Sequence, residues 1–263
     1  NISGGPKLFQ LYIHKDQALT DDLIDRCKRS GFNAMCLTVD TVVAGNRERD
    51  HKWGFTTPPK LNFKSLLSFA LHPRWSLNYL THEKFQLANV SHFTKKGSSI
   101  AKGVMEYINE QYDPAMSWKD AEYCIKRWGG PFAIKGVMSV EDAKRAVQIG
   151  ASAIMLSNHG GRQLDGSRAP FDQLPTIADA VGGKIEIILD GGIRRGTHVL
   201  KALSLGATAC SFGKGFLFAL GAGGQKGVEA ILQKMHDEIR RDMILLGCKS
   251  IKELNKDNIG FRL

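Results

Sequence analysis

A repeated alternation between short apolar runs and amphipathic helical segments constrains the fold of this chain more than any other feature. Six runs are rich in aliphatic and β-branched residues, which favour strands: 7–13, 34–40, 132–137, 152–157, 185–190 and 209–213. Two helical segments, 139–151 and 195–207, end in Gly-Ala just before the next run, as helices followed by a short loop commonly do. This alternation predicts an α/β fold with a parallel sheet buried on both faces.

Polar residues stand near the ends of most of the predicted strands. They are Gln10, Tyr12, Thr38, Asp40, Lys135, Ser157 and Asp190. An open α/β sheet concentrates its ligand site at one switch point, whereas a barrel builds its site from the carboxyl ends of many strands. The polar strand ends therefore favour a (β/α)8 TIM barrel over an open doubly wound sheet.

The chain is expected to form one barrel domain over residues 1–263, with a long insertion at about 45–130. A closed barrel of this type needs about eight strands, so the first two βα units are expected to be absent from this chain. The chain would then be a piece of a longer protein. The insertion is too long for a simple loop, because structureless loops longer than about 12–15 residues are uncommon.

The charge balance suggests an anionic partner. The chain has 36 Lys and Arg against 26 Asp and Glu, a formal net charge of +10. Such an excess suits a phosphorylated cofactor, an acidic substrate or an anionic membrane face. No nucleic-acid-binding signature occurs, and the His and Cys spacings match no metal site, so neither nucleic acid nor a metal is expected. Five cysteines without a C-x-x-C pair fit a reducing compartment.

Within the insertion, residues 61–80 combine many apolar positions with Lys64, Arg74, Trp75 and Tyr79. Basic residues and interfacial aromatics beside an apolar face are typical of a helix that lies in the plane of a membrane. The alternative is an excursion packed on its own barrel or on a neighbouring subunit. Pro73 is expected to break any helix that runs through the segment.

The motif SNHGGRQLD, residues 157–165, follows a predicted strand directly. A histidine can act as a base near neutral pH, and an arginine can hold a carboxylate with two parallel hydrogen bonds. His159 and Arg162, with glycines between them, could grip an acid and remove a proton next to it. The alternative is a histidine that caps a turn and an arginine in a surface ion pair. Arg47 is a second candidate for carboxylate binding, although it could also belong to a solvated charge run.

Two glycine-and-cation turns follow the last two predicted strands. In the first, Asp190, which can accept from ligand hydroxyls, precedes Gly191, Gly192 and Arg194, while the second holds Gly213 and Lys214. Glycine turns that open into helices suit a phosphate, and the late strands of barrels commonly bind one. Lys135 lies near the end of an apolar strand, so it needs an anion or an electron-rich ligand, unless it forms a buried structural pair with an aspartate.

The chain resembles the FMN-dependent L-2-hydroxy acid dehydrogenase and oxidase family, which includes lactate and mandelate dehydrogenases and glycolate oxidase. The resemblance is carried by a combination of motifs: FQLY, LTVD, GNRERD, IKG, SNHGGRQLD, LDGGIRRG and FGKG. The resemblance runs from residue 7 to about 255 and implies an FMN-binding (β/α)8 barrel. Segment 61–80 is most similar to the membrane-associated members of the family, in which this insertion docks on the membrane.

The resemblance implies a role for each polar strand end. His159 would be the catalytic base, Asp40 would stabilise its protonated form, and Tyr12 would hydrogen-bond the substrate. Arg47 and Arg162 would clamp the substrate carboxylate. The residues that would contact FMN are Gln10, Thr38, Lys135, Ser157, Asp190, Gly191, Gly192, Arg194, Gly213 and Lys214. Lys214 departs from the family, which usually has arginine there, and lysine lacks the two-pronged geometry.

The activity that the resemblance implies is oxidation of an L-2-hydroxy acid, with L-lactate as the expected substrate, to the 2-oxo acid. The expected electron acceptor is a membrane quinone or a cytochrome chain, and the expected location is the inner face of the cell membrane on the cytoplasmic side. A homo-oligomer, a tetramer by resemblance, is also expected. The alternatives are a mandelate dehydrogenase, a soluble oxidase that uses O2, or, in a different class, a non-catalytic flavin-binding module.

Overall fold

The computed structural model describes residues 4–48, 52, 62–82, 89 and 110–260. Its six strands form one parallel sheet in chain order, from β1 to β6. The strands are β1 (Leu8–Leu11), β2 (Ala34–Thr38), β3 (Phe132–Lys135), β4 (Ala153–Leu156), β5 (Glu186–Asp190) and β6 (Ala209–Ser211). Each falls within one of the six runs that the sequence predicts, so the alternation of strand and helix is confirmed.

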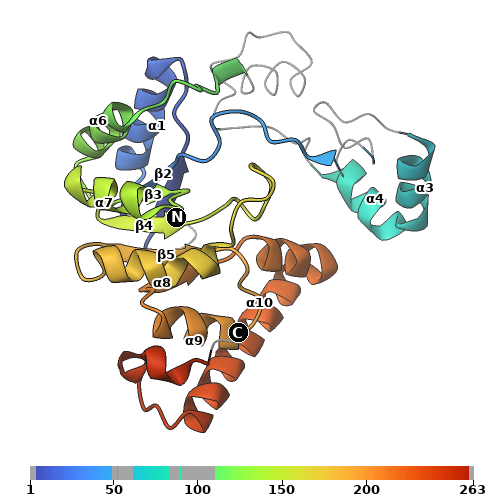
Figure 1. Cartoon of the computed structure of the whole chain (residues 1–263). Helices are drawn as coiled ribbons and strands as arrows, with labels where there is room; N and C mark the ends of the chain where they lie inside the picture. The colour runs from blue at the N-terminus through green and yellow to red at the C-terminus, as the bar shows by residue number, and fades with distance from the viewer. Residues whose placement is uncertain (1–3, 49–51, 53–61, 83–88, 90–109, 261–263) are drawn as a thin grey trace.

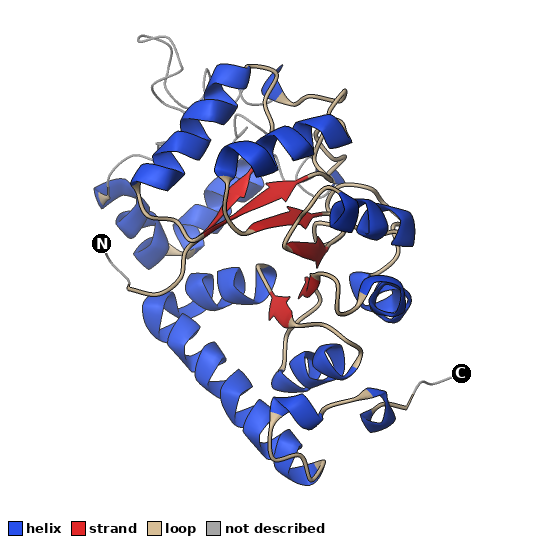
Figure 2. Ribbon diagram, turned by 90° about the vertical axis from the view of Figure 1, so that its left-hand side faces the viewer, coloured by secondary structure: helices blue, strands red, loops and turns tan. Residues whose placement is uncertain are grey.

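Helices follow the strands and cover the outside of the curved sheet (Figures 1 and 2). They are α1 (Gln17–Arg29), α6 (Trp118–Trp128), α7 (Val140–Gln148), α8 (Pro170–Val181), α9 (Gly196–Ser204) and α10 (Lys214–Leu245). Two short 3-10 helices follow α10, at Ile251–Glu253 and Lys256–Asn258. The architecture is that of a partial (β/α)8 barrel, which confirms the predicted fold class.

The two faces of the sheet carry different side chains because successive residues of a strand point in opposite directions. One face packs against the helices in the main core, which includes Leu37, Ile134 and Leu156. The other face carries a small cluster around Cys36, Ala133 and Met155. Burial of both faces is what the predicted parallel sheet requires.

The start of α1 differs from the sequence-based expectation. The run TDDLIDRCKRSG predicts a helix that begins after an N-cap at Thr20, but α1 begins at Gln17. Asp16 is the N-cap, and its side chain accepts a hydrogen bond from Ala18 N at 2.9 Å. Thr20 is fully buried and its Oγ1 accepts from His14 N, so its hydroxyl is used in tertiary packing.

The insertion contains a helical pair, α3 (Phe63–Leu71) and α4 (Pro73–Thr81), that stands apart from the sheet in Figure 1. The chain bends at His72, just before Pro73, as predicted. The rings of Phe69, Trp75 and Tyr79 stack on one another, with centroid separations of 5.5 and 5.3 Å. The two helices therefore pack on each other through aromatic side chains.

Helix α10 is interrupted. Residues 221–227, GAGGQKG, read as a loop from the sequence, but they lie within the span of α10. The backbone leaves helical angles only at Gly223 and Gly224. These two glycines separate two helical segments within α10, so the expected loop is shortened to a two-residue break at the kink.

Candidate active site

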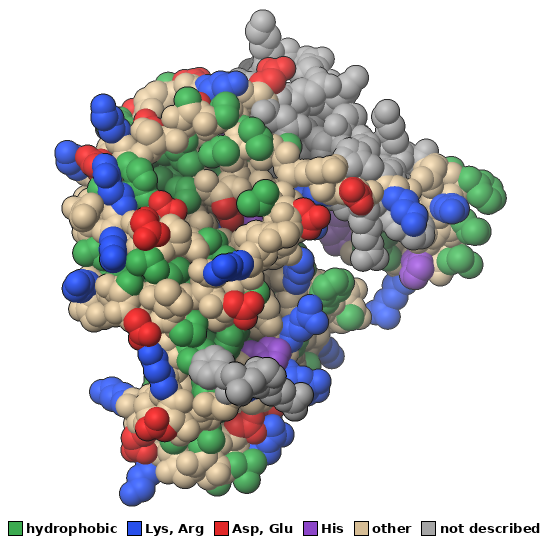
Figure 3. Space-filling view, viewed as in Figure 1, with side chains coloured by type: hydrophobic (Ala, Val, Ile, Leu, Met, Phe, Trp, Pro, Cys, Tyr) green, Lys and Arg blue, Asp and Glu red, His purple; other side chains and the backbone are tan. Residues whose placement is uncertain are grey.

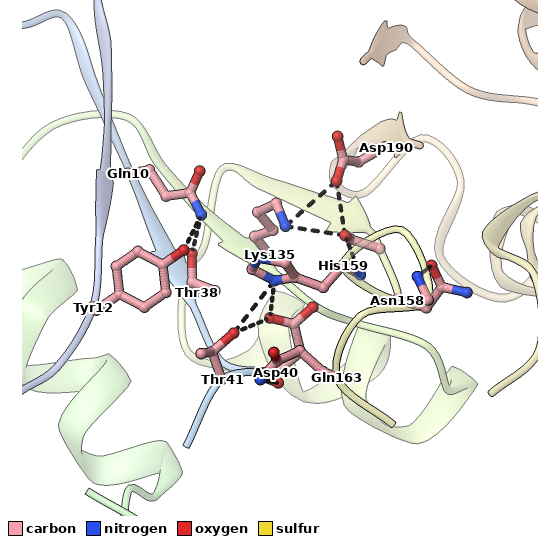
Figure 4. Close-up of polar contacts among 12 residues, drawn as sticks. Gln10, Tyr12, Thr38, Asp40, Thr41, Lys135, Asn158, His159, Gln163 and Asp190 are labelled. Carbon is pink, nitrogen blue, oxygen red and sulfur yellow. Dashed lines mark hydrogen bonds and ion pairs between the residues drawn. The ribbon is translucent and has the colours of Figure 1, made fainter. Parts of the chain in front are cut away.

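The polar strand ends converge at one edge of the sheet (Figure 4). Because the strands are parallel and run in sequence order, their carboxyl ends lie side by side. Gln10 and Tyr12 come from β1 and the residues after it, while Thr38 and Asp40 come from β2 and its following loop. Lys135 closes β3, Ser157 and His159 follow β4, and Asp190 closes β5.

His159 is paired with Asp40 in the centre of this cluster. His159 Nδ1 lies 3.0 Å from Asp40 Oδ1, and Thr41 Oγ1 lies 3.1 Å from the same oxygen and 3.3 Å from His159 Nδ1. The side chains of His159 and Asp40 are 21% and 14% exposed, so the pair is mostly shielded from water. An imidazole whose Nδ1–H is held by a carboxylate presents Nε2 as the free acceptor of a proton.

The turn that carries His159 has an unusual backbone. His159 has φ +56°, and Gly160 and Gly161 have φ +67° and +71°, so three successive residues are left-handed. This conformation is uncommon for a residue with a side chain and is found mostly where the surrounding structure fixes it. Asn158 contributes to that support, since its Oδ1 accepts from Gly161 N at 3.1 Å and its Nδ2 donates to Arg168 O.

Lys135 is buried and linked to two other strand ends. Its Nζ donates to Ser157 Oγ at 3.0 Å and lies 3.4 Å from Asp190 Oδ2. Ser157 Oγ in turn donates to Asp190 Oδ2 at 2.7 Å, and it accepts from His159 N at 3.1 Å. The buried Lys–Asp pair that was one interpretation of Lys135 is therefore present, and it lies directly beside the His159 turn.

Tyr12 lies in a polar group on the first two strands. Gln10 Nε2 donates to Tyr12 Oη at 2.9 Å and to Thr38 Oγ1 at 2.8 Å. Burial, followed by the nearby Tyr112 and Asp40, raises the pKa of Tyr12, so its phenol keeps its proton at neutral pH and can donate a hydrogen bond.

The two arginines lie on loops that touch. A Cβ placed on Gly45 would meet Arg162 O at 2.3 Å, so the loop that precedes Arg47 lies against the backbone of the SNHGGRQLD segment. Arg47 is half-buried, and its Nη2 donates to Gln163 Oε1 at 3.3 Å. Arg162 is exposed. The structure thus brings the two loops together, although they are far apart in the sequence.

The two expected phosphate turns lie at the ends of β5 and β6. Gly191 and Gly192 have φ +90° and +73°, and a Cβ on either would meet nothing within 4 Å, so their backbone is open to a ligand. Arg194 is exposed on the same turn, and Gly213 precedes α10. Lys214 Nζ donates to Gly160 O at 2.7 Å, which places this cation against the His159 turn.

The first N–H of α9 is already bonded to a carboxylate of the protein. Gly196 N, the first N–H of α9, donates to Glu238 Oε2 at 2.8 Å, and Glu238 is a buried residue of α10. A carboxylate at a helix N-terminus satisfies the free N–H groups there. An anion at this edge would instead meet the Gly191–Gly192 turn and the nearby cations.

The chemistry of the cluster suits a flavin phosphate ester and an acidic substrate. It combines a buried ammonium group, hydroxyls and carboxylates that can bind ligand hydroxyls, and open glycine turns beside cations. Asp40 Oδ2 and Arg47 Nε are buried and have no hydrogen-bond partner among the described residues. Buried polar atoms normally find partners, so these two atoms fit a site that receives polar groups from a ligand.

Three contributors to the site were not identified from the sequence: Thr41, Asn158 and Gln163. Asn158 had a detectable signal, because asparagine near a glycine pair commonly supports a turn. Thr41 and Gln163 had none, since their contacts depend on how separate loops meet. No group of metal-ligating side chains occurs among the residues that the structure describes.

The family model of the FMN-dependent dehydrogenases matches residues 1–260 of this chain. An L-lactate oxidase from Nostoc sp. is 41% identical over 247 residues, covering 94% of this chain and 62% of the relative. An L-lactate dehydrogenase from Xanthomonas campestris pv. campestris is 41% identical over 259 residues, covering 97% of this chain and 66% of the relative. The chain therefore spans somewhat less than two thirds of the length of these relatives.

Among solved structures, a monotopic membrane (S)-mandelate dehydrogenase is similar to this chain with a TM-score of 0.92 and 32% sequence identity. The similarity covers 99% of this chain and 68% of that protein.

Proposed function

Because this chain belongs to the FMN-dependent dehydrogenase family, we propose that it oxidises an L-2-hydroxy acid, with L-lactate as the substrate, to the 2-oxo acid. The observation that carries the proposal is the His159–Asp40 pair at 3.0 Å, beside two arginine-bearing loops that touch. A flavin-binding module has no need of a shielded base next to carboxylate-binding residues. The pair thus favours catalysis over the non-catalytic alternative.

In this proposal His159 Nε2 takes the proton of the substrate hydroxyl. Asp40 accepts the Nδ1–H bond and stabilises the imidazolium that forms, as the carboxylate does in other histidine–aspartate pairs. Tyr12, which stays protonated, donates a hydrogen bond to the substrate. Arg47 and Arg162 bind the substrate carboxylate and so fix the direction of the single α-hydrogen of L-lactate, which would leave with its electron pair to the two-electron acceptor.

The cofactor of the family is FMN, and bound FMN would supply the two-electron acceptor for the reaction. Lys135 would place its positive charge beside the flavin ring, supported by Ser157 and Asp190. The remaining contacts proposed for the cofactor are those of Gln10, Thr38, Gly191, Gly192, Arg194, Gly213 and Lys214. Lys214 Nζ donates one hydrogen bond to Gly160 O, which leaves two further N–H donors for the phosphate.

The relatives do not separate a dehydrogenase from an oxidase, since one of each is 41% identical to this chain. We place the acceptor in the membrane, as a quinone or cytochrome chain, because of the α3–α4 pair. Figure 3 shows green side chains gathered on this pair. They are Phe63 (79% exposed), Leu66, Leu67, Leu71 (69%), Trp75, Leu77, Tyr79 and Leu80 (78%). None of the described helices is long and apolar enough to cross a bilayer.

An exposed apolar face of this size normally marks a binding surface. We propose that it lies in the interface of the inner face of the cell membrane, where Lys64 and Arg74 meet anionic headgroups. The structural similarity to a monotopic membrane dehydrogenase supports this arrangement. Assembly into a homo-oligomer, with residues 1–263 contributing to one barrel domain in each subunit, is part of the same proposal.

The experiment that tests the proposal is anaerobic reduction of the purified, FMN-loaded protein. L-Lactate, L-mandelate and glycolate are added separately while the flavin absorbance is followed. Bleaching by L-lactate at the lowest concentration supports the proposed substrate, whereas preferential bleaching by L-mandelate favours the mandelate alternative. An absence of bleaching with all three acids contradicts the enzymatic proposal.

A further inference from the structure

Gln163 connects the loop after β4, which carries His159 and Arg162, to the loop after β2, which carries Asp40 and Arg47. Its Nε2 donates to Val43 O at 3.0 Å and to Asp40 O at 3.4 Å. Its Oε1 accepts from Arg47 Nη2 at 3.3 Å. Figure 4 shows Gln163 next to Asp40, below the His159 ring. One carboxamide therefore touches both the turn that carries Asp40 and the guanidinium of Arg47.

The orientation of this carboxamide is fixed by its partners. The carbonyl oxygens of Asp40 and Val43 can only accept, and a guanidinium can only donate. Rotation of the amide by 180° would place its oxygen against two carbonyls and its NH2 group against a cation. Neither a carboxylate nor an apolar side chain of the same size could satisfy both sides of this environment.

The contact between the loops is tight as well as polar. A Cβ on Gly45 would lie 2.9 Å from Gln163 Oε1 and 3.0 Å from Gln163 Cα, in addition to its clash with Arg162 O. The glycine lets the backbone of one loop come within contact of the other. Gln163 therefore packs directly against residues 43–47 as well as bonding to them.

Arg47 depends on this support. Its Nε is buried without a partner among the described residues, and its Nη2 donates to Gln163 Oε1. Because Gln163 is neutral, Arg47 keeps its positive charge for a ligand. The hydrogen bond to Gln163 holds the guanidinium of this long, flexible side chain in one direction. Gln163 supplies direction without neutralising the charge, which an acidic residue would do.

We propose that Gln163 is a positioning residue. It holds Arg47 and the turn that carries Asp40 at a fixed place relative to His159, and so sets the affinity for the substrate carboxylate. The inference rests on the proposed function and adds to it the residue that couples the base to the clamp. Gln163 itself is not placed in contact with the substrate.

The test uses oxalate, a small dicarboxylate that has no α-hydrogen to lose, as a binding probe on the FMN-loaded protein. Calorimetric titration gives its dissociation constant for wild type, Gln163→Met and Gln163→Glu, each at pH 8. Gln148→Met, on the exposed surface of α7, is the matched control. Thermal midpoints and bound FMN are measured for every variant.

We expect Gln163→Met to weaken oxalate binding roughly 10-fold or more, because a hydrogen bond to a charged group is lost. Gln163→Glu should weaken it further, since a carboxylate would repel the carbonyls of Asp40 and Val43 and neutralise Arg47. A residue that only fills space would show the opposite order, because glutamate is closest to glutamine in shape. Gln148→Met should bind oxalate like wild type.

A double-mutant comparison adds a second readout. Lysine at position 47 keeps the charge on a flexible stem that one amide does not orient. In an Arg47→Lys background, Gln163→Met should therefore change oxalate binding by at most about 2-fold. Three results would each overturn the inference. They are an equal effect of Gln163→Met in both backgrounds, a milder effect for Gln163→Glu than for Gln163→Met, and no oxalate binding by wild type. Failure of all three hydroxy acids to bleach the flavin, with the oxalate results as expected, would instead contradict the proposed reaction alone.

Discussion

Asp40 Oδ1 lies 3.0 Å from Nδ1 of His159, although 119 residues separate the two in the chain. The aspartate follows β2 and the histidine follows β4, so their pairing depends on β3 lying between these strands. Thr41 Oγ1 reaches both partners and further limits their movement. The imidazole of the proposed catalytic base is thus oriented by a residue from another strand end, while its neighbours Ser157 and Asn158 hold the backbone of its turn.

Asp40→Asn is expected to lower the rate of flavin reduction by about 100-fold or more, since positioned acid–base groups contribute factors of this size. An amide can turn its NH2 group to the imidazole and favour the wrong tautomer, in which Nε2 carries the proton. Stopped-flow absorbance with saturating L-lactate measures the rate. FMN content serves as the control, and a rate equal to that of wild type would exclude the proposed role of Asp40.

Lys135→Met is expected to destabilise the protein by about 3–5 kcal/mol, because it leaves the carboxylate of Asp190 partly buried without its cation. The side chains of Lys135 and Asp190 are only 9% and 14% exposed. The free energy of unfolding of the FMN-free protein is obtained from urea titration. Lys144→Met, at an exposed position of α7, should change it little, and an equal effect of both changes would contradict the importance of the buried pair.

Gly45→Ala is expected to cost about 1–3 kcal/mol of stability, as overpacked substitutions do, and to weaken carboxylate binding. Its Cβ would lie 2.3 Å from Arg162 O, so the two loops would have to separate. Gly221→Ala is the matched control, because a Cβ there meets nothing within 4 Å inside α10. Chemical denaturation and oxalate titration give both effects, and unchanged values for Gly45→Ala would show that the loops are not held in contact.

The stability of the protein should fall as the pH decreases below 6.5, the ordinary pKa of histidine. Burial lowers the pKa of His14 in the folded state, and the charge of Asp16 offsets only part of this effect. The unfolded chain therefore binds a proton first as the pH falls, and stability is lost from pH 6.5 down to the folded pKa. Urea midpoints at pH 7.5 and 5.5 should differ less for His14→Gln than for wild type. The same pH dependence in both proteins would assign it to other groups.

Replacement of Phe63, Leu77 and Leu80 by serine should release the protein from membranes while activity with a soluble electron acceptor persists. These side chains are 79%, 65% and 78% exposed, so their loss removes apolar surface without opening the core. Flotation with vesicles that contain anionic lipid measures binding. A wild type that does not float with the vesicles would contradict the proposed membrane contact.

The fold was predictable from the sequence because its signals are local. The apolar runs at 34–40 and 185–190 are short and rich in residues that favour strands, and their alternation with helical segments predicts a parallel sheet. The start of α1 was not predictable to within a turn, since Asp16 and Thr20 are both good caps and only tertiary packing buries Thr20.

The site was predictable in part for a related physical reason. Residues at strand ends, such as Lys135 and His159, must converge once a barrel forms. Gln163 and Thr41 act through contacts between loops, and no spacing or periodicity encodes those contacts. Their contributions became visible only when the loops were placed in space.

The central claim is that His159 removes a proton from an L-2-hydroxy acid held beside FMN. Its most direct test is the rate of anaerobic flavin bleaching by L-lactate in wild type and in His159→Gln, compared at equal FMN content. The account predicts rapid bleaching in wild type and a rate lower by about 100-fold to 10,000-fold in the variant, with FMN still bound. Equal rates in the two proteins, or no bleaching of wild type by any 2-hydroxy acid, would contradict it.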